Sequence, residues 1–76
     1  MTQDEWMGLF SDNLASLMHE RNMTQKELAE ETGLSKGAVN KYVNGTRMPG
    51  AKAILNISYA LDCDLMDLID FDEPIE

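Results

Sequence analysis

Residues 24–45 have the sequence TQKELAEETGLSKGAVNKYVNG, which contains the signals for two short helices joined by a tight turn. Thr24 and Glu27 have the spacing of a capping box and predict the start of the first helix. Gly33 follows, and because glycine adopts left-handed backbone conformations without strain, we expect the chain to turn sharply there. Ser35 is a residue type preferred at the N-cap, so the second helix should begin directly after it.

The second of these helices divides into an apolar and a polar side. At about 100° per residue, its polar positions fall within an arc of about 140°. They are Lys36, Gly37, Asn40, Lys41 and Asn44, and the opposite side carries Ala38, Val39, Tyr42 and Val43. A strip of this width suits the contact that a helix makes in the major groove, where lysine can donate to guanine, asparagine can pair with adenine and glycine permits close approach. We therefore predict that Lys36, Gly37, Asn40 and Lys41 read base edges.

Residues beside this strip have side chains suited to DNA phosphates. Gln25 lies in the first turn of the first helix, where free backbone N–H groups and the helix dipole attract an anion. At the end of the second helix and directly after it lie Asn44, Thr46 and Arg47, whose side chains can bind DNA phosphates. Such contacts fix the register of the protein on the duplex but do not read its sequence. We also assign Ser35, the expected N-cap, to the phosphate contacts.

Helices are also expected on both sides of this segment. Thr2 and Glu5 repeat the capping-box spacing, so a helix should begin near Gln3 and end near Asn22. Its apolar stripe consists of Trp6, Phe10, Leu14, Leu17, Met18 and Arg21.

Beyond Pro49, a fourth helix should cover about residues 50–61, and Asp64 can cap a short fifth helix. The buried side chains are expected to be Ile54, Ile57, Ser58 and Leu61 in the fourth helix and Leu65, Leu68 and Ile69 in the fifth. We therefore predict an all-α, five-helix fold. It should form one domain over residues 1–76, with a core at 6–70, a helix-turn-helix at 24–44 and an acidic tail at 71–76.

The chain has a formal net charge of -8, which opposes DNA binding because phosphate attraction needs a basic surface. The charges are nevertheless separated along the sequence. All six Lys and Arg residues lie between positions 21 and 52, and no Asp or Glu occurs from Thr32 to Leu61. That interval contains Lys36, Lys41, Arg47 and Lys52. A cationic surface can therefore form in the middle of the chain.

Several function classes find no support in the sequence. No apolar run approaches the roughly 18 residues needed to span a bilayer, and residues 1–10 lack the positive charge of a secretory signal, so a cytoplasmic location is expected. The lone Cys63 forms neither an internal disulfide nor a cysteine metal cage, and we expect a packed thiol. His19 should be exposed, with no second ligand in view. We predict no enzyme, catalytic residue, metal, cofactor or small-molecule ligand.

The helix-turn-helix segment resembles the phage repressor and Cro family of DNA-binding proteins, also called Xre-type regulators. The resemblance lies in the run from Thr24 to Ser35, in Val39, Tyr42, Asn44-Gly45 and Pro49, and it extends over roughly residues 10–69. It implies a five-helix, lambda-repressor-like domain that binds operator DNA, usually as a homodimer. It also implies that Lys36, Gly37 and Lys41 read bases and that Gln25, Asn44 and Arg47 touch phosphates.

Two positions depart from the family pattern. Many members pair an arginine in the first helix with a glutamate late in the third, whereas the matching residues here are Met18 and Val43, so we expect an apolar contact instead. Gly37 stands where relatives often carry a base-reading side chain. Sequence discrimination should then depend more on Lys36, Asn40 and Lys41.

On the sequence alone, two functions stay open. The first is sequence-specific binding of double-stranded DNA by a repressor-type transcriptional regulator, encoded by a phage, a mobile element or a host, acting as a dimer on an inverted-repeat operator. The second is a protein-binding helix-turn-helix module, such as an antirepressor or antitoxin-like partner, with weak or no DNA binding. The seven carboxylates after Leu61 suggest the second function. Trp6 and residues 1–7 either cover the core or meet a partner chain.

Overall fold

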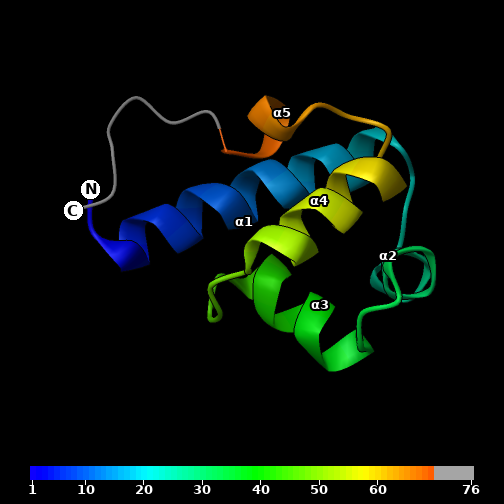
Figure 1. The fold of residues 1–76 in the computed structure, drawn as a ribbon, viewed down its shortest axis with the longest axis horizontal. Coiled ribbons are helices and arrows are strands. Elements are labelled where there is room, and N and C mark those ends of the chain that lie inside the picture. The colour runs from blue at the N-terminus through cyan, green and yellow to red at the C-terminus, as the bar shows by residue number, and fades with distance from the viewer. Residues whose placement is uncertain (70–76) are drawn as a thin grey trace.

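The computed structural model describes residues 1–69, which form five α-helices and no β-strand (Figure 1). In chain order these are α1 (Gln3–Glu20), α2 (Gln25–Thr32), α3 (Lys36–Asn44), α4 (Ala51–Ala60) and α5 (Leu65–Ile69). The long helix α1 packs against α3 and α5, and α2 packs against α3 and α4. The predicted all-α, five-helix fold is confirmed. The expected acidic tail at 71–76 and the last residue of the expected core, at 70, lie outside the described residues.

Side-chain caps fix the starts of the first three helices. The hydroxyl oxygens of Thr2, Thr24 and Ser35 each accept a hydrogen bond from the backbone N–H three residues later, over 3.2, 3.1 and 3.0 Å. At α2 the Glu27 carboxylate also accepts from the N–H of Thr24 (3.1 Å), which completes the capping box. These bonds satisfy backbone donors that a helix start leaves without partners. The predicted helix starts are therefore confirmed.

Three helices end with the same closing turn, in which a residue with positive φ redirects the chain. These residues are Asn22 (φ 52°), Gly45 (φ 72°) and Asp62 (φ 51°). In each turn the next residue donates its N–H to a carbonyl five residues back, as Thr46 does to Lys41 over 3.0 Å. This arrangement is the Schellman motif, which satisfies carbonyl groups at a helix end. The helix α2 ends at Gly33 (φ 76°), the expected turn glycine.

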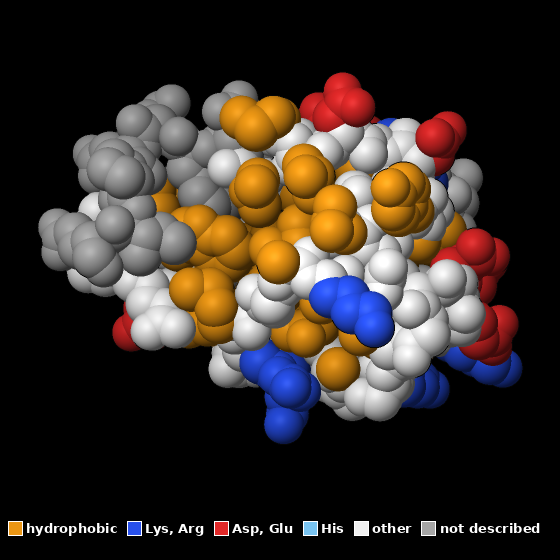
Figure 2. Space-filling model, in the orientation of Figure 1, with side chains coloured by type: hydrophobic (Ala, Val, Ile, Leu, Met, Phe, Trp, Pro, Cys, Tyr) orange, Lys and Arg blue, Asp and Glu red, His pale blue; other side chains and the backbone are white. Residues whose placement is uncertain are grey.

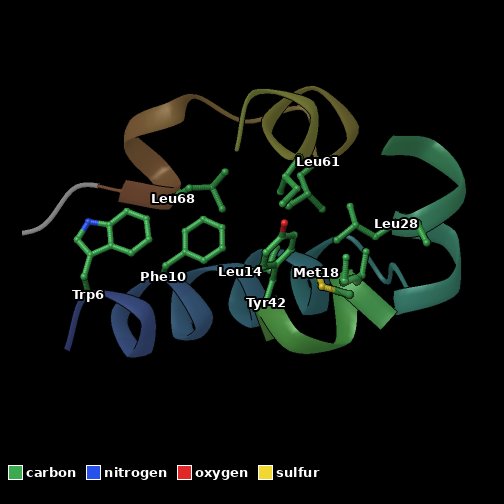
Figure 3. Close-up of a cluster of buried hydrophobic side chains, with 12 residues drawn as sticks. Trp6, Phe10, Leu14, Met18, Leu28, Tyr42, Leu61 and Leu68 are labelled. Carbon is green, nitrogen blue, oxygen red and sulfur yellow. The ribbon is translucent and has the colours of Figure 1, made fainter. Parts of the chain in front are cut away.

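The buried side chains form one cluster between the helices (Figure 3). They are Trp6, Phe10, Leu14 and Met18 from the predicted stripe of α1, and Leu28, Ala29, Ala38, Val39, Tyr42, Ile57, Leu61 and Leu68 from elsewhere. Trp6 stacks on Phe10 with ring centroids 5.5 Å apart, and Met1 and Met7 pack against the same cluster. The N-terminal residues therefore cover the core of their own chain, which is one of the two arrangements that the sequence left open.

The packing of α5 differs from the prediction at one residue. Leu68 is fully buried and Ile69 is half-buried, but Leu65, which we expected in the core, is 37% exposed. Leu65 instead lines an open apolar groove with residues of α4. The start of α5 is held by the backbone N–H of Asp64, which donates to the Asp67 carboxylate over 3.1 Å.

Polar side chains of α1, and of Arg21 directly after it, bind backbone carbonyls at or near the ends of three other helices. Ser11 Oγ donates to Val43, Asn13 Nδ2 donates to Leu68 over 2.9 Å, and Arg21 Nε donates to Leu61. Arg21 was expected on the apolar stripe; it is exposed instead, because a charged guanidinium stays in contact with water, and its Nε binds the Leu61 carbonyl beyond α4. Met18 and Val43, at the positions of the family's ion pair, both belong to the apolar cluster.

Within residues 1–69, no helix is long and apolar enough to cross a lipid bilayer. In the same residues, no group of three or more His, Cys, Asp and Glu side chains is placed to hold a metal ion. Cys63 is a half-buried free thiol, and His19 is exposed in the last turn of α1.

Candidate nucleic-acid interface

The helix α3 presents a polar strip to solvent. Lys36, Gly37, Asn40, Lys41 and Asn44 are all exposed. On the opposite side, Ala38, Val39 and Tyr42 are buried and Val43 is half-buried. The predicted division of α3 is confirmed, and the four residues assigned to base reading lie together on one accessible surface.

The turn between α2 and α3 is held by hydrogen bonds from one side chain. Thr32 Oγ1 donates to the Leu28 carbonyl (2.7 Å) and accepts from the N–H of Leu34 (3.2 Å). Leu28 and Val39 are fully buried, so the inner sides of both helices are anchored in the cluster. The polar strip of α3 is therefore fixed in position by the packing of its other side.

Three side-chain amides form a chain of hydrogen bonds over the outside of α2 and α3, which we call the amide chain. Asn40 Nδ2 donates to Gln25 Oε1 over 3.2 Å, and Asn44 Nδ2 donates to Asn40 Oδ1 over 3.1 Å. Gln25 is half-buried in the first turn of α2, and the two asparagines are exposed on α3. In the amide chain, Asn40, which we assigned to a base, connects Gln25 and Asn44, which we assigned to phosphates.

The other residues assigned to phosphates lie at the two ends of α3. Ser35 uses its oxygen as an acceptor from the N–H of Ala38, so its hydroxyl hydrogen is still able to donate outward. After α3, Thr46 Oγ1 donates to the Lys41 carbonyl over 3.3 Å. The guanidinium carbon of Arg47 lies over the ring of Tyr42, 5.8 Å from its centre, within the range of a cation–π contact.

The charge separation expected from the sequence is also present in space. Most Lys and Arg side chains visible in Figure 2 lie in the lower part of the view, around α3, whereas Asp and Glu side chains gather mainly at the upper and right edges. The ion pair among residues 1–69 joins Arg21 to Glu20 (3.2 Å), away from α3. The exposed ammonium groups of Lys36 and Lys41 are thus available to an anion.

The arrangement matches a known kind of DNA-binding domain. Residues 13–74 match the Cro/C1-type HTH DNA-binding domain family. The chain belongs to this family. The match covers all of α2, α3, α4 and α5 and residues 13–20 of α1, so it includes both α2 and α3.

The chain is also similar to one curated relative and to one solved structure. The chain is 35% identical over 57 residues to the uncharacterized HTH-type transcriptional regulator YqaE of Bacillus subtilis (strain 168). That match covers 75% of this chain and 49% of YqaE, so the chain spans about half the length of this relative. The fold is similar to that of the restriction-modification controller protein C.AhdI from Aeromonas hydrophila, with a TM-score of 0.79 and 27% identity, over 82% of this chain and 94% of the controller protein.

Two features of this surface were not predicted from the sequence. One is the amide chain, and the other is the stacking of Arg47 on Tyr42. The pairing of Gln25 with Asn40 depends on the angle at which α2 crosses α3. The hydrophobic periodicity of a single helix gives no information about this angle. A search for amide residues that face each other across the two helices of a helix-turn-helix is the signal that could have found it.

Proposed function

We propose that this chain is a sequence-specific, double-stranded-DNA-binding regulator of transcription that inserts α3 into the major groove. The observation that carries the proposal is the exposed cationic strip of α3, whose opposite side is buried against the core. Lys36, Gly37 and Lys41 contact base edges. The phosphate contacts come from Gln25, Ser35, Asn44, Thr46 and Arg47. The protein acts by binding, in the cytoplasm, and not by catalysis.

We also propose that two copies bind one operator and repress by covering a promoter. Ala51, Ile54, Leu55, Leu65 and Ile69 line an open apolar groove of about 210 Å³ between α4 and α5. On the same two helices, Tyr59 is 81% and Met66 is 58% exposed, and exposed apolar side chains that gather into one patch mark an interaction surface. In Figure 2 most of the apolar side chains lie above the cationic side chains of the lower part of the view, and the two kinds meet at the middle. A two-fold interface uses the same surface on both copies, so we propose that a second copy packs its own groove there and that both α3 helices then face one duplex.

The decisive experiment is selection of bound DNA from a random pool. We expect an enriched inverted repeat whose half-sites are about 34–36 Å apart, one helical turn of DNA. If each copy neutralises about four phosphates, the logarithm of the affinity should fall with the logarithm of salt concentration at a slope of about -7 for the dimer. Enrichment of no site, together with tight capture of a protein partner, would instead support a protein-binding module.

Substitutions separate the two kinds of contact. Lys36→Ala should change base preference at one position of each half-site and cost about 1–3 kcal/mol on the selected operator. Gln25→Ala should weaken binding to every sequence by the same factor, because phosphates carry no sequence information. An equal loss on all sequences for Lys36→Ala would contradict its assignment to a base.

A further inference from the structure

We infer that Asn40 is a positioning residue, whose side chain is held by Asn44 and orients Gln25 toward the DNA backbone before the DNA arrives. The inference rests on the proposed DNA-binding function and specifies how part of that surface works. It also assigns to Asn40 a different role from the base reading that the sequence suggested.

The direction of the hydrogen bonds carries the argument. Phosphate oxygens only accept hydrogen bonds, so a glutamine that binds phosphate has to present its NH₂ group and not its carbonyl oxygen. Asn40 Nδ2 donates to Gln25 Oε1 over 3.2 Å, which engages the carbonyl oxygen on the protein side. Both N–H groups of Gln25 Nε2 then stay available for the phosphate. Without Asn40, the amide of Gln25 can rotate and present either end.

Asn44 holds Asn40 in place. Its Nδ2 donates to Asn40 Oδ1 over 3.1 Å, which fixes the plane of the Asn40 amide and leaves the second N–H of Asn44 Nδ2 for a phosphate. Bidentate pairing with adenine would require the oxygen and the nitrogen of Asn40 to face one base together. In this structure each of those atoms is engaged by a different neighbour, on α2 and on α3. The contacts of Asn40 therefore suit the positioning of Gln25 better than a base contact.

Ordering a side chain before binding removes an entropic cost from the binding step, because a long flexible glutamine otherwise loses its rotamer freedom on DNA. The effect should be a loss of about five- to tenfold in affinity when Asn40 is replaced by Ala. The loss should be equal for the selected operator and for each of its single-base variants, since phosphates are common to all of them.

The first test is a double-mutant cycle read out by DNA affinity. Asn40→Ala, Gln25→Ala and the double variant are each measured on the selected operator and its base variants, and the same cycle is repeated with Asn44→Ala. We expect Asn40→Ala to leave base preference unchanged and to add almost nothing once Gln25 is already Ala. A relaxed preference at one base position, or a full additional loss in the Gln25→Ala background, would overturn the inference.

The second test does not use DNA. Nitrogen-15 relaxation of the side-chain NH₂ of Gln25 is compared in the free wild-type protein and in Asn40→Ala, with thermal unfolding to verify that both are folded. We expect the Gln25 amide to be ordered in the wild type and mobile in the variant, and equal mobility in both would refute the link. If the wild type shows this ordering but binds no DNA sequence selectively, the proposed function fails and the link between the amides stands.

Discussion

Gly37 is an exposed glycine near the start of α3 that the fold itself does not require. Its φ is not positive, and a Cβ added there would meet no protein atom within 4 Å. A glycine in a helix lowers stability relative to alanine because it has more conformational freedom to lose on folding. Neither the backbone conformation nor the packing of the protein requires a glycine at this position. This favours a role for Gly37 in contact with DNA.

Gly37→Ala should therefore change stability and affinity in opposite directions. We expect the free energy of unfolding, measured by urea titration, to rise by about 0.5 kcal/mol, at the lower end of the usual range because Gly37 lies in the first helical turn. Affinity for the selected operator should fall, because a methyl group would separate α3 from the base edges. Gly33→Ala is a useful contrast, since φ of 76° makes it destabilising although the space around it is open. An increase in both stability and affinity for Gly37→Ala would remove close approach as the explanation.

Cys63 allows a prediction about pH. Burial raises the pKa of its thiol above the ordinary value of 9.0, the carboxylates of Asp67, Asp64 and Asp62 raise it further, and Arg21 lowers it in part. A raised pKa leaves less thiolate at neutral pH, and the thiolate is the reactive form. Alkylation by iodoacetamide should consequently be slower than that of free cysteine at pH 7 to 8 and should accelerate only as pH rises beyond about 9. Rapid alkylation of the folded protein at neutral pH would contradict the packed-thiol assignment.

At the scale of the helix, Ser35 combines a structural and a binding task that substitutions can separate. Its oxygen caps α3, and aspartate caps a helix about as well as serine, whereas alanine does not. Ser35→Ala should cost about 1 kcal/mol of stability, and Ser35→Asp should cost little. On DNA, Ser35→Asp should nevertheless bind every sequence more weakly, because it places a carboxylate beside a phosphate. Unchanged affinity of the stable Ser35→Asp variant would exclude Ser35 from the backbone contacts.

The starts and ends of the helices were largely predictable because they depend on a few adjacent residues. Thr24 with Glu27, Gly33 and Ser35 act through hydrogen bonds and backbone conformations within one turn, so their effects are contained in the local sequence. Asn22 and Asp62 were not identified as positive-φ positions, because asparagine and aspartate adopt this conformation only when the surrounding chain favours it.

Contacts between helices were harder to predict. A helical wheel correctly separated the sides of α3, but it contains no information about which residue of another helix lies opposite. Arg21 was therefore placed on an apolar stripe, although its guanidinium binds the Leu61 carbonyl. For the same reason the partner of Asn40 on α2 was missed. The assignment of individual residues to bases and phosphates stays a prediction.

For the whole molecule, the proposed dimer makes a prediction with a matched control. Leu55 lines the groove between α4 and α5 and is 42% exposed, whereas Leu9 on α1 is 40% exposed and does not line it. Leu55→Asp should place a charge in the interface, shift the mass measured by sedimentation toward the monomer and reduce the salt slope of DNA binding by about half. Leu9→Asp should leave both measurements unchanged. A monomeric wild type on operator DNA, or equal effects of the two substitutions, would rule out this surface as the dimer contact.

The separation of charge across the protein has a consequence for how fast it meets a duplex. At an ionic strength of 0.01 M the screening length is about 30 Å, which is comparable to the 33 Å length of the molecule. A distant DNA duplex therefore interacts with the total charge of -8, and the two molecules repel each other. At 0.15 M the screening length falls to about 8 Å, and only the lysine-bearing side facing the grooves is sensed at close range. The association rate constant should accordingly pass through a maximum at intermediate ionic strength, unlike that of a uniformly basic DNA-binding protein, which is fastest in the most dilute buffer.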